Sequence, residues 1–178
     1  MKSFKTVIAS ALMLLAAPLI ASADTPTVGV GVNAVEGYNN LRDYLADHIG
    51  QYAYEFDLFE NPTVKSRLEN LLGEQEFNYL VKDVYQTQTP IEYNDGMFHA
   101  SGFQKHMGGD PGMVWAYNPQ LDAFYVYLNN NGKIRLWAGS PDNLADFSSV
   151  ITMEGYQAPA ETSMTPQMFF NNLWASNP

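Results

Sequence analysis

The stretch Ala123-Phe124-Tyr125-Val126-Tyr127-Leu128 has the strongest strand character in the chain, because it consists of aromatic, β-branched and aliphatic residues. Asn129-Asn130-Asn131-Gly132 follows as a turn signal and leads into a second strand-like segment, Lys133–Trp137. Tight turns join antiparallel neighbours. The two segments therefore predict adjacent antiparallel strands.

Three further strands are predicted upstream. Ile91–Tyr93 and Met97–Ser101 flank Asn94-Asp95-Gly96, which is a tight hairpin turn signal, and Met113–Tyr117 follows them. Five short strands joined by turns are typical of an antiparallel meander.

Two helical regions precede the strands. From Leu41 to Tyr52, apolar residues recur at steps of three and four, and we interpret His48 on this stripe as a packed side chain. Asn61-Pro62 is a helix start and Gly73 a stop, so Asn61–Tyr85 is predicted as a helical hairpin or one bent helix. Together these elements predict an α+β domain, an antiparallel meander sheet of about five strands with helices packed on one face.

Residues 1–23 are predicted to be a signal peptide. Lys2 and Lys5 precede the apolar run Val7–Ile20, and the small residues Ala21-Ser22-Ala23 follow as a cleavage site. The alternative, a membrane anchor, is disfavoured because the run is short for spanning. We expect export to the periplasm or beyond, with no membrane span after cleavage.

The remaining residues, 24–178, are predicted to form a single α+β domain, because no internal repeat or long linker divides them. Residues 24–38 have no sustained period and are predicted to be a loose lead-in. A last helix is predicted from Thr165 through Trp174.

The chain is acidic, with 9 basic and 19 acidic residues and a net charge of -10. If Lys2 and Lys5 leave with the signal peptide, 7 basic residues remain against 19 acidic ones, a net charge of -12. This balance argues against nucleic acid and anionic membrane surfaces as partners and suits a cationic partner. The absence of cysteine excludes thiol chemistry and cysteine-ligated metals.

Residues 102–112, Gly-Phe-Gln-Lys-His-Met-Gly-Gly-Asp-Pro-Gly, interrupt the strand pattern with a loop. Four glycines and a proline surround the basic pair Lys105-His106. Loops held between strands often carry binding or catalytic residues. The alternative is a plain glycine-rich connection with an exposed histidine.

The sequence contains no clear motif for the common catalytic chemistries. His48, His99, His106 and Asp110 lack the spacing of a metal site. Ser101 lies near two of these histidines and could form a triad with Asp110, but the strand-turn-helix elbow of such serines is missing. No phosphate-binding loop is present, and the acidic residues single out no catalytic pair. We therefore predict a protein that is not an enzyme and has no cofactor or metal.

Residues 61–137 resemble the family of the bacterial inhibitor of vertebrate lysozyme (Ivy). The segments that carry the resemblance are Asn61–Leu68, Leu71–Gly73, Thr89–Glu92, Ala100–Gly102, Val114–Pro119 and Phe124–Leu128, with the loop and its His106 between them. The resemblance implies an α+β fold and inhibition of lysozyme.

In that family the loop reads Cys-Lys-Pro-His-Asp-Cys, and its histidine and acid enter the lysozyme cleft. On this chain the cysteines fall at Phe103 and Gly108, the histidine at His106 and the acid at Met107. The histidine is retained, whereas both cysteines and the acid are absent. A disulfide would reduce the conformational entropy that the loop loses on docking. Without it, fixing the backbone of Gly108 and Gly109 on docking costs about 1–2 kcal/mol per residue.

The leading hypothesis is a periplasmic or secreted inhibitor that blocks the cleft of a cationic c-type lysozyme or related muramidase with loop 102–112. His106 would be the anchor, with Lys105 and Gln104 assisting. Asp110 could replace the missing acid if the loop path allows it.

The alternative hypothesis is a non-inhibitory cell-envelope protein with the same fold that binds peptidoglycan fragments or another protein. Tyr125, Tyr127 and Trp137 would then form a stacking face for glycan. We favour ordinary sheet packing for these side chains, because aromatic residues are common in strands.

Overall fold

The computed structural model describes residue 38 and residues 40–159, which all fall within one unit of the chain. The predicted signal peptide, the lead-in apart from Tyr38, and the last predicted helix lie outside the described residues. The prediction of a single domain over 24–178 stays a prediction. The helices are α1 (Leu41–Ala46), the 3-10 helices η1 (Ala53–Phe56) and η2 (Leu58–Glu60), α2 (Pro62–Leu72), α3 (Glu74–Tyr79), the π-helix η3 (Leu80–Val84) and α4 (Leu144–Met153).

The sheet is antiparallel, and its strand order is β1-β3-β4-β5-β6, with β2 also paired to β3. This order confirms the predicted meander. The strands are β1 (Thr87–Gln88), β2 (Glu92–Asn94), β3 (Met97–Phe103), β4 (Gly112–Asn118), β5 (Ala123–Asn130) and β6 (Lys133–Ala138).

Two tight turns set the register of the meander. Asp95 and Gly96 join β2 to β3 with φ angles of 49° and 77°, and Asn131 and Gly132 join β5 to β6 with φ angles of 52° and 75°. A two-residue hairpin turn with positive φ at both positions matches the twist of its strands, and Asp-Gly and Asn-Gly favour it. Local sequence therefore determines both turns.

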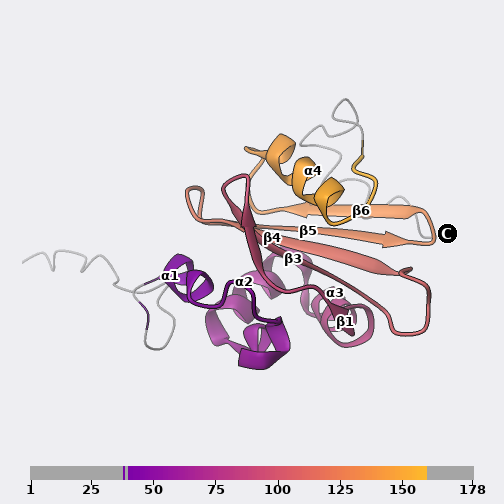
Figure 1. The fold of residues 1–178 in the computed structure, drawn as a ribbon, viewed down its shortest axis with the longest axis horizontal. Helices are drawn as coiled ribbons and strands as arrows, with labels where there is room; N and C mark the ends of the chain where they lie inside the picture. Colours follow the sequence, from indigo (N-terminus) through magenta and orange to yellow (C-terminus); the bar gives the residue numbers. More distant parts are fainter. Residues whose placement is uncertain (1–37, 39, 160–178) are drawn as a thin grey trace, which may run out of the picture. The chain divides into compact units, whose positions relative to one another are not determined.

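Helices cover both faces of the sheet (Figure 1). The elements α1 to η3 pack on one face, where alternate strand residues such as Trp115 and Val126 are buried. On the other face, Phe147, Val150 and Ile151 of α4 pack against strand residues including Tyr125 and Tyr127. The α+β class is confirmed, and the second face carries α4, a helix that the sequence did not indicate.

The region predicted as a helical hairpin or bent helix consists of α2, α3 and η3. Asn61 caps α2, because its side-chain oxygen accepts hydrogen bonds from the backbone N–H groups of Thr63 (3.0 Å) and Val64 (3.4 Å). Gly73, at a φ of 82°, separates α2 from α3. The predicted start and stop are both confirmed.

The first helix is shorter than predicted. α1 ends at Ala46, and Ile49 and Tyr52 are 49% and 37% exposed, so the apolar stripe does not continue to Tyr52. The chain leaves the helix because Gly50 donates its N–H to Ile91 O at 2.8 Å. His48 is packed as predicted, stacked on Phe56 with ring centroids 3.9 Å apart.

Candidate functional site

The exposed loop between β3 and β4, residues 104–111, is the candidate site; we call it the β3–β4 loop. Its tip presents Lys105 and His106 to solvent, and Met107 is 54% exposed. His106 has a φ of 63°, an uncommon conformation for a residue other than glycine. Gln104 and Asp110 are half-buried at the flanks of the tip.

The loop closes on itself through its backbone. Gln104 donates its N–H to Pro111 O at 3.1 Å, and Asp110 donates its N–H to Met107 O at 3.4 Å. Gly108 and Gly109 lie between Met107 and Asp110, with φ angles of 67° and 95°. Glycine adopts such angles without a steric penalty, so these residues permit the reversal at the tip.

Aromatic rings pack on the base of the loop from both faces of the sheet. A Cβ atom on Gly102 would overlap the ring of Tyr85, and one on Gly112 would overlap the hydroxyl end of Tyr156. Tyr85 follows η3 on one face, whereas Tyr156 follows α4 on the other. Both glycines are therefore required by close packing at the roots of the two strands.

Two hydrogen bonds connect the loop to other parts of the molecule. Lys105 donates its backbone N–H to Oε1 of Gln86 at 3.1 Å, and Asn131 donates its backbone N–H to Oδ1 of Asp110 at 2.8 Å. Gln86 precedes β1, and Asn131 lies in the β5–β6 turn. Sequence reasoning assigned neither residue to the site, because a contact across the fold leaves no local pattern.

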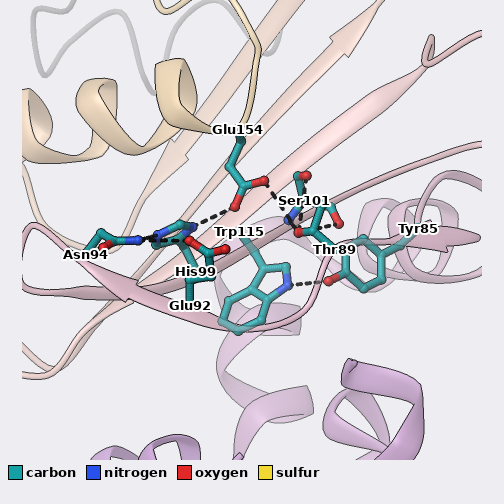
Figure 2. Close-up of polar contacts among 8 residues, drawn as sticks. All are labelled: Tyr85, Thr89, Glu92, Asn94, His99, Ser101, Trp115 and Glu154. Carbon is teal, nitrogen blue, oxygen red and sulfur yellow. Dashed lines mark hydrogen bonds and ion pairs between the residues drawn. The ribbon is translucent and has the colours of Figure 1, made fainter. Parts of the chain in front are cut away.

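A second polar cluster is buried between β3 and the end of α4 (Figure 2). His99 and Glu154 have side chains only 1% and 8% exposed, and Nδ1 of His99 lies 2.7 Å from Oε1 of Glu154. A carboxylate can only accept, so Nδ1 is the donor. On the other side of the ring, Nε2 of His99 lies 3.2 Å from Nδ2 of Asn94. The Asn94 amide also donates a hydrogen bond to the carboxylate of Glu92.

The second oxygen of Glu154 accepts a hydrogen bond from Thr89 Oγ1 at 3.4 Å. That hydroxyl in turn accepts from Oγ of Ser101 at 3.4 Å (Figure 2). Burial alone would raise the pKa of Glu154, but hydrogen bonds from His99, Ser101 and Thr89 outweigh this effect and lower the pKa below its ordinary value. The carboxylate is thus stabilised in its charged form.

This cluster does not form the triad considered from sequence. In a nucleophilic triad the histidine lies between the hydroxyl and the acid. Here the carboxylate of Glu154 lies between His99 and the Thr89–Ser101 hydroxyl pair, so the histidine does not activate the serine. His106 and Asp110 belong to the exposed loop instead. We interpret the cluster as a structural connection between β3 and α4.

The aromatic face considered for glycan stacking is not available. Tyr125 and Tyr127 are fully buried against α4 and the segment after it, and Trp137 is 4% exposed in the opposite core. These three side chains pack in the cores on the two faces of the sheet. The favoured interpretation of these three aromatics, ordinary sheet packing, is confirmed, and the exposed stacking face considered under the alternative hypothesis is absent.

Within residues 40–159, no helix is long and apolar enough to cross a membrane. The same described residues contain no group of three or more histidine, aspartate or glutamate side chains placed to hold a metal ion.

Residues 63–151, half of the 178-residue chain, match the family described as inhibitor of vertebrate lysozyme (Ivy). The match begins in α2, includes the whole β3–β4 loop and ends in α4. It extends beyond Trp137, where the resemblance seen in the sequence stopped. No curated protein and no solved structure matches the chain.

Proposed function

The chain belongs to the Ivy family of inhibitors of vertebrate lysozyme, and we propose that it blocks the active-site cleft of a cationic c-type lysozyme or a related muramidase with its β3–β4 loop. The observation that carries the proposal is the exposed tip, where Lys105 and His106 lie on a loop tied at both flanks to the rest of the fold.

The chemistry of the tip suits a cleft that contains acids. Glycoside hydrolases of this kind use a pair of carboxyl groups. An imidazole N–H of His106 can donate to such a carboxylate, and the Lys105 ammonium adds positive charge beside it. Met107 stands where the family pattern has an acid, so its side chain supplies apolar contact rather than charge.

The remaining predicted contact residues have different surroundings. Gln104 lies at the flank of the tip and can assist with its side-chain amide. Asp110, in contrast, already accepts a hydrogen bond from Asn131, so we assign the direct contacts with the enzyme to His106, Lys105 and Gln104.

Charge and export fit the same function. A net charge of -10 favours encounter with a cationic enzyme, because complementary fields steer association. The predicted signal peptide would bring the protein to the periplasm or outside the cell, where it would meet a lysozyme.

The test is a titration of a vertebrate c-type lysozyme, acting on cell-wall substrate, with the purified exported protein. We expect activity to fall as the inhibitor is added, and we expect a chitin oligosaccharide that fills the cleft to weaken the inhibition competitively. Full activity at a large excess of inhibitor would refute the proposal. Inhibition insensitive to the oligosaccharide would refute occlusion of the cleft.

Comparing this inhibition assay with a binding titration of peptidoglycan fragments decides between the two hypotheses. Saturable binding of peptidoglycan fragments by a protein that leaves lysozyme active would favour the cell-envelope alternative.

The matched control is Gln120→Ala, an exposed position in the β4–β5 turn at the opposite end of β4 from the loop. This variant should inhibit as the wild type does.

A further inference from the structure

The tip of the β3–β4 loop has little intrinsic stiffness. Gly108 and Gly109 are glycines, the residue type with the greatest backbone conformational freedom. The chain also has no cysteine to cross-link the loop. A flexible loop loses more conformational entropy on docking than one that is already ordered, and this loss weakens binding. A binding loop of this composition therefore gains affinity from any contact that restricts it before docking.

The first such contact lies on the side of β3. Gln86 Oε1 accepts the Lys105 N–H at 3.1 Å, and its Nε2 donates to Lys82 O at 3.2 Å, so both ends of the amide are held. The preceding residue, Tyr85, is fixed as well, because its hydroxyl accepts a hydrogen bond from buried Trp115 Nε1 at 3.0 Å. The Gln86 amide is thus hydrogen-bonded at both ends, and it follows a buried residue.

The second contact lies on the side of β4. Asp110 Oδ1 accepts the Asn131 N–H at 2.8 Å. The β5–β6 turn that supplies this donor is itself closed by Gly132, which donates its N–H to Asn129 Oδ1 at 2.9 Å. Hydrogen bonds to a charged carboxylate are stronger than neutral ones.

The two contacts flank residues 106–109 and come from different parts of the fold. We infer that Gln86 and Asp110 are positioning residues, which hold the β3–β4 loop in its binding conformation without contacting the enzyme themselves. This inference rests on the proposed function for its consequence in binding, whereas the ordering of the loop can be measured without any partner.

The first test uses the free protein. Backbone ¹⁵N order parameters for residues 105–109 should fall from values typical of rigid backbone, about 0.85, toward those of flexible segments, below about 0.6, in Gln86→Ala and in Asp110→Ala. Asp110→Asn retains a side-chain oxygen acceptor and should keep the loop ordered. Gln120→Ala and His106→Ala should leave the order parameters unchanged. Unchanged order in both Gln86→Ala and Asp110→Ala would overturn the inference.

The second test measures binding to a c-type lysozyme. We expect Kd to rise about 5- to 30-fold in Gln86→Ala and in Asp110→Ala, because the loop is no longer ordered before it docks. We expect a Kd near the wild-type value in Asp110→Asn, which loses the charge but keeps the acceptor that orders the loop. Equal weakening by Asp110→Asn and Asp110→Ala would instead indicate direct contact through the carboxylate, and would overturn the positioning role of Asp110. Loss of loop order with no change in Kd would overturn the role of both residues in binding.

The two tests separate the inference from the proposed function. If wild-type protein does not bind lysozyme, the proposed function fails, and the order parameters still decide whether Gln86 and Asp110 order the loop. If wild-type protein binds and the variants bind equally well, the proposed function stands and the positioning role fails.

Discussion

Gly102 illustrates how one residue type at one position keeps the base of the loop in place. It lies on β3 directly beneath the ring of Tyr85, and an added Cβ atom would also lie 2.9 Å from Thr87 O. Gly102→Ala should therefore lower the free energy of unfolding by about 1–3 kcal/mol, since overpacking displaces side chains and backbone. Urea denaturation followed by tryptophan fluorescence measures the change.

The matched control for Gly102→Ala is again the exposed Gln120→Ala, which should shift the unfolding midpoint very little. A midpoint for Gly102→Ala equal to that of the wild type would show that Tyr85 can move aside without loss, and that the tight packing at the root of β3 is not needed.

At the level of single residues, sequence reasoning located the loop and His106 but not what holds them. His106 is found from its place in a loop pattern shared with a family. The partner of Asp110 is a backbone N–H in a turn 21 residues away, and Gln86 lies 19 residues before Lys105. Such contacts depend on how strands pair in space, and no periodicity records them.

Among the secondary-structure elements, α4 is connected to the sheet by a buried carboxylate at its C-terminal end. Glu154 directly follows the helix, and its carboxylate is bound to His99 of β3 on one side and to Thr89 on the other. Ser149 of α4 adds a hydrogen bond to Asp95 at 2.7 Å. The buried carboxylate thus contributes to the docking of α4 on its face of the sheet.

This connection makes the free energy of unfolding depend on pH in the acid range. The folded-state pKa of Glu154 lies below its ordinary value of 4.5, so the unfolded chain binds more protons in the acid range. The contribution of Glu154 is present above about pH 4.5 and is lost as the pH falls through the lowered pKa. The free energy of unfolding should therefore decrease below about pH 4.5, as measured by denaturation at a series of pH values.

The variant Glu154→Gln isolates this contribution. At neutral pH it should be less stable by about 1.5–3 kcal/mol, the usual range for a hydrogen bond to a charged group. Its stability should also fall less steeply on acidification than that of the wild type. Parallel pH profiles for the two proteins would contradict the role given to Glu154.

Prediction of the elements succeeded where the signals are local. The strands from β2 to β6 and their Asp-Gly and Asn-Gly turns follow from alternation and turn chemistry. α1 was predicted too long, because Gly50 pairs with Ile91, a contact that sequence periodicity does not record. α4 was missed, and its buried residues Phe147, Val150 and Ile151 are explained only by the sheet face that they cover.

For the whole molecule, the excess of acidic residues predicts how association responds to salt. With a net charge of -10, the protein should associate with a cationic lysozyme more slowly as ionic strength rises, since the screening length falls from about 10 Å at 0.1 M to about 3 Å at 1 M. The association rate constant should fall by about tenfold or more over this range, while dissociation changes less. Stopped-flow mixing measures both rates, and a salt-independent association rate would contradict electrostatic steering.

The most direct measurement of the central claim is the calorimetric affinity of wild-type protein and of His106→Ala for a vertebrate c-type lysozyme. His106 is exposed and its side chain has no role in the described core, so the variant should fold normally. We predict that Kd rises by about 30-fold or more in His106→Ala, which corresponds to about 2 kcal/mol, and that Gln120→Ala binds as the wild type does. Equal affinities for wild type and His106→Ala, or no binding by the wild type, would contradict the account.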